Sequence, residues 1–357
     1  MKTNSIKDLS HLPESVIITS RGVASRSSLL SIPEKNIFVF DGVSPNTKLT
    51  EVKICLGKIK KLKYKNIIGI GGGSVLDFAK LIATIDSIPE HGIRSQIENN
   101  RVLKSRYKTL FLIPTLFGSG AEQTPFAVCY ISEKKYSVSS PAMIADKVIY
   151  DQELINSIPQ KIRLANILDC FCQAFESMTT AKANSVSIVY SKKAIQLLIN
   201  SAPDYTAGNN SQSEDIMLAS EYSGKAIAIT KTTGPHAFSY YLTSKLQLPH
   251  GIAVASVFII FFKLYNQFYR NNVKIDLALE FLSIEFKSSD TNESLYAFFK
   301  DCGLNIDKIF KEIIAKIDFK DWFKNVNLER LNNGPEMKTE YLNYLAFKNY
   351  FVDVAEQ

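Results

Sequence analysis

An aspartate and a glutamine stand four residues apart in ILDCFCQAFES, residues 167–177, as Asp169 and Gln173. On an α-helix, residues four apart lie on the same face, so both side chains would point at one place. An aspartate followed by a histidine at this spacing would indicate a metal site. The glutamine carbonyl oxygen is a neutral donor like imidazole, but it is a harder and weaker ligand for Fe²⁺ or Zn²⁺.

Two histidines could complete such a site. The chain contains only four, and two of them, His236 in TTGPHAFSYY and His250 in LQLPHGIAVA, each follow a proline directly. Proline at this place is typical of a helix start. Together with Asp169 they would form an oxygen and imidazole site suited to Fe²⁺ or Zn²⁺. A lone histidine is more often a surface or core residue, so the prediction depends on the three meeting in the fold.

The segment GIGGGSVLDFAK, residues 69–80, joins the end of an apolar strand to a predicted helix. Glycines there allow the backbone to approach a phosphate, and the start of a helix offers free N–H groups and partial positive charge. Ser74 could add a hydroxyl donor. The alternative is a tight turn that needs glycine only for its dihedral angles.

Two further segments indicate a dinucleotide. Asp41 ends the strand FVFDG, where an acid can accept hydrogen bonds from a ribose 2′-hydroxyl and repel a 2′-phosphate. This favours NAD over NADP, although an aspartate in a loop without a ligand is almost as common. In PTLFGSGAEQTPFAVCY, residues 114–130, Thr115, Ser119 and Thr124 could donate to phosphate or ribose oxygens.

The elements that must position these residues differ between the two halves of the chain. Apolar strand signals at 37–43, 66–74 and 109–115 alternate with helical stretches at 47–64 and 75–85. This alternation predicts a parallel sheet covered on both faces. After about residue 155 the apolar residues recur at helical spacing. The sequence therefore predicts an α/β Rossmann-like domain, residues 1–155, followed by an all-helical domain, residues 156–357.

Composition narrows the classes of function. The net charge is +7, and the basic group KIKKLKYK at 58–65 is predicted to be a solvated helix face, without the aromatic and glycine pattern of an RNA-binding strand. The surplus charge favours an anionic small substrate. The five cysteines have no CxxC spacing, which argues against disulfides and a cysteine-rich zinc site.

The chain is expected to be cytoplasmic, with no nucleic-acid or membrane partner. Its first sixteen residues are too polar for a secretory signal. The longest apolar run, residues 251–262, is too short to span a bilayer and is predicted to form a buried helix.

Several long motifs, in order along nearly the whole chain, resemble the iron-containing (group III) alcohol dehydrogenase family. GGGSVLDFAK is similar to its GGGSxxDxAK, and PTLFGSGAEQTPFAV to its PTTAGTGSExTPFAV. KYSVSSPAMIADKVIYDQEL, residues 135–154, resembles the segment that joins its two domains. GPHAFSYYLTSKLQLPHGIAVA resembles HAxAH…PHGxANA, with the same fourteen-residue step between histidines. LNNGPEMKTE, residues 331–340, is an altered form of its NPR.LT stretch.

The resemblance implies the metal ligands. In the family an aspartate, a histidine four residues later and two further histidines hold the metal, which correspond to Asp169, Gln173, His236 and His250. Neither of the other two histidines lies in a matching motif. Because three of the four ligands are present, we expect one Fe²⁺ or Zn²⁺ ion to be retained.

The resemblance also implies an NAD site in a dehydroquinate synthase-like fold. Asp77 and Leu116 lie in the two matching nucleotide motifs. The predicted cofactor-binding residues are then Asp41, Gly72, Gly73, Ser74, Asp77, Thr115, Leu116, Ser119 and Thr124.

Two positions depart from the family near the expected reaction centre. Tyr240 stands where many members have the second histidine of HAxAH. Its hydroxyl can relay a proton, although a pKa near 10 suits a base poorly, and it could also be only a packing residue. Lys231 stands where the family usually has an uncharged residue. It is a candidate anchor for a substrate carboxylate or phosphate, and a solvent-facing lysine is the plainer interpretation.

The predicted function is a metal-dependent NAD(H) oxidoreductase that interconverts an alcohol and an aldehyde or ketone, with its site between the two domains. The substrate is expected to be a polar sugar or polyol, acidic ones included; an example is the sugar acid Kdo, whose terminal hydroxyl one branch of the family oxidises. The alternatives are an enzyme like dehydroquinate synthase or glycerol-1-phosphate dehydrogenase, and an inactive nucleotide-binding relative. Family analogy suggests a homodimer.

Overall fold

The computed structural model describes residues 12, 14–25, 37–101, 105–132, 134–269, 271–336 and 341–355. These residues form two compact units, Met1–Ile158 and Pro159–Gln357. The division lies three residues beyond the one expected from the sequence, after the short helix α5 (Gln152–Asn156).

The first unit contains a parallel five-stranded sheet with the order β2-β1-β3-β4-β7. Its strands are β1 (Ser15–Thr19), β2 (Ile37–Phe40), β3 (Asn66–Gly71), β4 (Thr109–Pro114) and β7 (Lys147–Val148). Strand β1 was not predicted; it lies between β2 and β3, so that Ile17 is paired with both Val39 and Ile68. Strand β7, which pairs with β4, was not predicted either.

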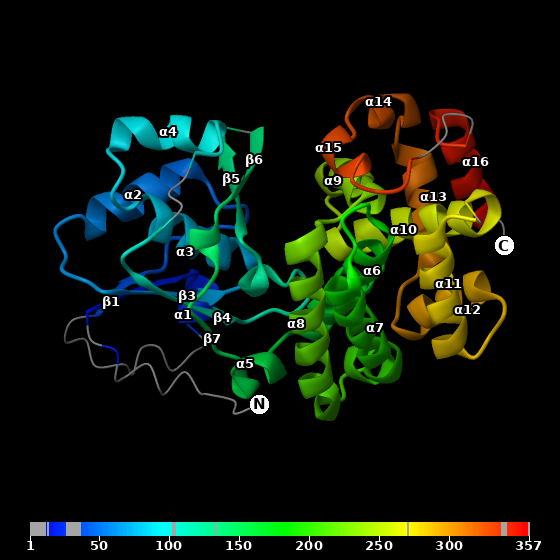
Figure 1. Cartoon of the computed structure of the whole chain (residues 1–357), viewed down its shortest axis with the longest axis horizontal. Helices are drawn as coiled ribbons and strands as arrows, with labels where there is room; N and C mark the ends of the chain where they lie inside the picture. The colour runs from blue at the N-terminus through cyan, green and yellow to red at the C-terminus, as the bar shows by residue number, and fades with distance from the viewer. Residues whose placement is uncertain are drawn as a thin grey trace. The chain divides into compact units, whose positions relative to one another are not determined.

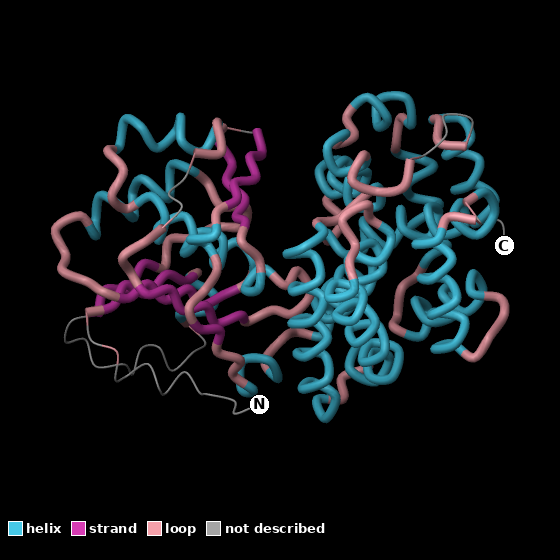
Figure 2. Tube along the Cα trace, viewed as in Figure 1, coloured by secondary structure: helices cyan, strands magenta, loops and turns pink. Residues whose placement is uncertain are grey.

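Both faces of this sheet are covered, as the apolar strand runs predicted. Val16 and Ile18 belong to a core with helices α2 (Leu49–Ile59), α3 (Gly73–Ile85) and α4 (Glu90–Glu98). The alternate residue, Ile17, packs in a second core with residues of β3 and β4. Helices α2, α3 and α4 lie together on one side of the strands (Figures 1 and 2).

Two details of the first unit differ from expectation. Residues after the small-residue loop form an antiparallel hairpin of β5 (Phe126–Ile131) and β6 (Lys134–Ser139). Helix α2 ends at Ile59, so most of the basic group 58–65 lies beyond it, with its lysines exposed. This group has too few apolar residues to bury a helical face, which explains the early end of α2.

The second unit is helical, as predicted. Its helices are α6 (Gln160–Thr179), α7 (Ser185–Thr206), α8 (Ser213–Thr230), α9 (Gly234–Leu246), α10 (His250–Phe268), α11 (Val273–Phe286), α12 (Thr291–Asp301), α13 (Ile306–Lys316), α14 (Phe319–Lys324), α15 (Leu328–Leu331) and α16 (Tyr344–Ala355). Phenylalanines of α6 and α10 form its centre; Phe175, for example, packs edge-on against Phe258 and Phe262.

Helix α10 is the buried helix that the apolar run predicted. Among the described residues it is the single helix long and apolar enough to cross a membrane by length and composition, with a mean hydropathy of 1.5. Of its most apolar stretch, 72% is buried inside the protein, which is typical of the core helix of a soluble protein.

Candidate metal centre and nucleotide pocket

Helix α6 carries three polar side chains in line along one buried face. Asp169, Gln173 and Glu176 are spaced at i, i+4 and i+7, so they follow one another along the same stripe. All three are buried, with 7%, 2% and 0% of their surface exposed. Burial of two carboxyl groups is costly unless cations or hydrogen bonds compensate for it, so this stripe predicts partners nearby.

The two histidines supply those partners from the starts of two helices. Helix α9 begins at Gly234, and its early proline places His236 in the first turn, while α10 begins at His250 itself. Gly251 is what allows α10 to approach α6. A Cβ at Gly251 would lie 1.7 Å from the backbone oxygen of Ala165, so only glycine fits this crossing.

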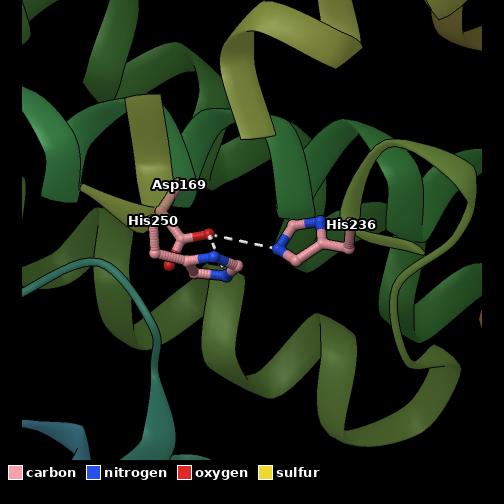
Figure 3. Close-up of side chains that lie close together, drawn as sticks. All are labelled: Asp169, His236 and His250. Atoms are coloured by element: carbon pink, nitrogen blue, oxygen red, sulfur yellow. Dashed lines mark hydrogen bonds and ion pairs between the residues drawn. The ribbon is translucent and has the colours of Figure 1, made fainter. Parts of the chain in front are cut away.

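The fold brings Asp169, His236 and His250 together. Asp169 Oδ1 lies 3.1 Å from His236 Nε2 and 3.9 Å from His250 Nε2. Figure 3 shows both imidazoles around the aspartate carboxylate. Asp169 and His236 are buried, whereas the His250 side chain is 40% exposed. The cluster is therefore closed on one side and open on the side of His250.

A fourth residue, Glu176, was not predicted. Its Oε2 lies 2.9 Å from His236 Nδ1 and accepts the backbone N–H of Thr233, also at 2.9 Å. Both nitrogens of His236 therefore face carboxylates, which calls for two N–H donors and a protonated ring. Burial alone would lower the pKa of His236, but Glu176 and Asp169 outweigh it and raise the pKa to about 10.

The same contacts keep Asp169 ionised. Burial raises the pKa of this carboxyl, but the charge of His250, the hydrogen bond from His236 and the more remote charge of Arg330 together bring it below its usual value. An ionised aspartate is the form that coordinates a metal ion.

These residues fit a divalent transition metal. Three donor atoms, one from each of Asp169, His236 and His250, lie within 4.8 Å of one another. A tetrahedral site with bonds of 2.0–2.2 Å spaces its donors roughly 3.4 Å apart, close to the two distances above. Glu176 holds the far nitrogen of His236, which is the usual support for a metal-binding histidine. The donor set of one carboxylate and two imidazoles suits iron or zinc.

Three other residues were predicted at this site: Tyr240, Gln173 and Lys231. The Tyr240 ring stacks on His250, with 5.9 Å between ring centroids and 8° between planes. Gln173 lies one turn after Asp169 on α6, and its role as a ligand stays a prediction. Lys231 ends α8 with a positive φ of 60°, and its side chain is 43% exposed and 3.4 Å from Glu329. This ion pair weakens the case for Lys231 as a substrate anchor.

Arg330 is a second residue that the sequence did not indicate. It lies on α15, its guanidinium is 5.8 Å from the Tyr240 ring, and it donates a hydrogen bond to Thr232. The matching terminal stretch begins one residue later; its residues 337–340 lie outside the described residues.

In the first unit a pocket of about 620 Å³ opens at the start of α3. Five of the predicted cofactor residues line it: Asp41, Gly72, Gly73, Ser74 and Leu116. The glycines provide space there, since a Cβ at Gly72 would lie 2.9 Å from Leu116 and one at Gly73 would lie 3.3 Å from Ser119 Oγ. Its other lining residues were not predicted: Ser20, Arg21, Gly22, Gly42, Val43, Ser44, Pro45 and Val75.

The remaining predicted cofactor residues are not among those lining this pocket. Thr115 continues β4, where its N–H bonds to Gly71, and Ser119 adjoins Gly73. Asp77 accepts the N–H of Val128 at 2.9 Å. Asp77 thus joins α3 to β5, and Lys80 donates to Thr124 Oγ1 at 3.1 Å, which joins α3 to the segment before β5.

Two family models match the chain. The iron-containing alcohol dehydrogenase model covers residues 3–152, and the C-terminal model of the Fe-containing alcohol dehydrogenase family covers residues 164–324. The crystal structure of sulfoacetaldehyde reductase from Bifidobacterium kashiwanohense in complex with NAD⁺ has a TM-score of 0.84 at 23% identity, over 99% of this chain and 94% of that one. This similarity concerns the fold.

Relatives with similar sequences are named as dehydrogenases or reductases. 4-Hydroxybutyrate dehydrogenase of Clostridium kluyveri is 28% identical over 57% of this chain and 55% of its own length, so the match spans about half of that protein. Lactaldehyde reductase of Escherichia coli is 26% identical over 74% of this chain and 72% of its own. These relatives are dehydrogenases and reductases, in agreement with the predicted enzyme class. The chain belongs to the iron-containing alcohol dehydrogenase family.

Proposed function

We propose that this chain is a metal-dependent, NAD(H)-linked oxidoreductase that interconverts an alcohol and an aldehyde or ketone. The observation that carries the proposal is the convergence of Asp169, His236 and His250 in a chain that matches both models of the family. These three residues, with Gln173 as the predicted fourth ligand, would hold one divalent metal ion. The family description favours iron over zinc.

The pocket at the start of α3 supports NAD as the second substrate. Gly72 and Gly73 leave the first backbone N–H groups of α3 accessible to a pyrophosphate. Asp41 lines the same pocket and suits a ribose 2′-hydroxyl, which favours NAD over NADP.

When bound, the metal ion would polarise the substrate oxygen and the nicotinamide would exchange a hydride with the substrate carbon. Residues of the chain would orient the metal ligands and transfer the proton. Glu176 fixes the orientation of His236 and keeps its Nδ1 protonated, so that Nε2 faces the cluster. In this proposal Tyr240, whose ring stacks on that of His250, would pass a proton between solvent and the substrate oxygen.

The substrate we propose is a short-chain aldehyde or its alcohol. The names of the three relatives described above refer to 4-hydroxybutyrate, lactaldehyde and sulfoacetaldehyde, all of them short molecules, whereas another relative is named for long-chain alcohols. The eight-carbon sugar acid Kdo and other polyols stay predictions from the sequence. A homodimer and a cytoplasmic location are likewise proposals from family analogy.

The test is turnover of short aldehydes with NADH, followed at 340 nm, by protein stripped with a chelator and then reloaded with Fe²⁺ or Zn²⁺. We expect oxidation of NADH that requires both metal and aldehyde. Product formed without net NADH consumption would instead indicate a synthase that recycles its cofactor. Tight NAD⁺ binding without turnover under any metal would indicate an inactive relative.

A further inference from the structure

Arg330 is held in a defined place by the segment around it. Asn327 caps the start of α15 by accepting the N–H of Arg330. The guanidinium donates to Thr232, and the Asn333 amide donates to the backbone oxygens of Thr230 and Thr232, at 2.8 and 3.1 Å. The arginine therefore lies fixed against the loop that precedes α9, although α15 itself is near the surface.

A stack of rings connects this arginine with the metal cluster. Arg330 lies over the Tyr240 ring at 5.8 Å, and Tyr240 in turn lies parallel to the His250 ring at 5.9 Å. The His250 side chain is also the exposed side of the cluster. A small molecule that reaches the cluster from this side would pass beside Tyr240 and Arg330.

Among the described residues, Arg330 has no carboxylate as an ion-pair partner. No carboxylate lies within 4.0 Å of it in the described part of the chain, whereas the neighbouring Lys231 has Glu329 at 3.4 Å. Arginine has five N–H donors arranged as a planar fork that matches carboxylate and sulfonate oxygens. The described contacts use one guanidinium nitrogen, for Thr232.

We propose that Arg330 binds the anionic end of the substrate, a carboxylate or a sulfonate on a short chain, while the other end lies at the metal cluster. This inference rests on the proposed function and assigns it a substrate class, short acidic aldehydes and alcohols. Only the Tyr240 ring separates Arg330 from His250, with 5.8 Å on one side and 5.9 Å on the other, so a substrate that contacts both Arg330 and the cluster would need a chain of only a few carbons. Arg330 is then a specificity-determining residue, and Lys231 is not.

The test compares two aldehydes of equal length, succinic semialdehyde with a carboxylate and butanal without one. The measured quantity is the ratio of kcat/KM for the acidic aldehyde to that for the neutral one. In Arg330→Gln we expect this ratio to fall roughly 10- to 100-fold, chiefly through KM, because a hydrogen bond to a charged group is lost. Arg330→Lys keeps the charge without the fork and should recover part of the ratio.

Two further variants and a binding measurement complete the design. Lys245→Gln removes an equal charge from an exposed position at the end of α9 and should leave the ratio within twofold. Lys231→Gln tests the rival anchor. Calorimetry with butyrate and with propanesulfonate, neither of which can be reduced, measures anion binding without turnover and separates carboxylate from sulfonate. Metal content and circular dichroism of Arg330→Gln should equal those of the unmodified protein.

The outcomes separate the two proposals. Turnover with an unchanged ratio in Arg330→Gln, or a ratio lost in Lys231→Gln instead, would overturn the role of Arg330 and leave the proposed function standing. A ratio below one in the unmodified protein would do the same. Absence of turnover with both aldehydes, in protein that is loaded with metal, would overturn both proposals.

Discussion

The buried carboxylate of Glu176 should control the protonation of His236, and the substitution Glu176→Gln tests this directly. The glutamate accepts from both Thr233 and His236 at 2.9 Å, and an amide oxygen can keep both bonds. Only the charge is lost. A hydrogen bond to a charged group contributes about 1.5–3 kcal/mol and a neutral one about 0.5–1.5, so the difference is roughly 1–1.5 kcal/mol. This corresponds to a pKa lowered by about one unit.

The assay is nuclear magnetic resonance of metal-free protein labelled at histidine, titrated from pH 6 to 10.5. With four histidines in the chain, each signal can be assigned by substitution. We expect His236 to titrate near pH 10 in the unmodified protein and about one unit lower in Glu176→Gln. Glu221→Gln is the matched control, because Glu221 is a buried glutamate of α8 that is paired with Lys225. A His236 that titrates near 6.5, or is unaffected by Glu176→Gln, would show that the charge of Glu176 does not control its protonation.

The stability of the metal-free protein should follow the same titration. Since the folded pKa of His236 lies above its unfolded value of about 6.5, its stabilising contribution is complete below pH 6.5 and is lost as the pH rises towards 10. The difference in free energy of unfolding between the unmodified protein and Glu176→Gln should therefore stay roughly constant up to about pH 9 and shrink between about pH 9 and pH 10, as measured by urea denaturation. In a second experiment, Gly251→Ala should lower the free energy of unfolding by about 1–3 kcal/mol and reduce metal binding, because the added methyl group meets the Ala165 backbone. The control is Gly57→Ala, where the added methyl group has open space around it. Equal melting temperatures for the two variants would contradict the close packing of α10 on α6 at Gly251. In a third experiment, Asp41→Ser should raise the ratio of kcat/KM for NADPH to that for NADH by roughly tenfold or more, because the acid no longer repels the 2′-phosphate. Arg21, which lines the same pocket, could then contact that phosphate. An unchanged ratio would show that Asp41 does not contact the ribose.

The fold class was predictable because each half of the chain has a single dominant periodicity. Continuous apolar runs marked β3 and β4, and helical spacing marked α6 and α10. Strand β1 was missed because its apolar run is only a few residues long, although its pairing with β2 and β3 makes it central. Hairpin β5–β6 was missed since its alternation follows directly on a loop that has the composition of a ligand site.

The metal cluster was predictable in part. Asp169, His236 and His250 were identified from spacing and resemblance, and the fold brings them together. Glu176 could have been found, because it lies seven residues after Asp169 and so on the same face. Arg330 could not, because its place beside Tyr240 depends on how α15 packs, and no local pattern encodes that contact.

The most direct test of the metal site is the metal content of protein purified without chelator, beside the variants His250→Ala and Gln173→Ala. We expect about one iron or zinc per chain, lost in His250→Ala and more weakly held in Gln173→Ala. Full metal content in His250→Ala would contradict the cluster described here. Protein that holds no metal, even after reconstitution with Fe²⁺ and Zn²⁺, would contradict the proposed function itself.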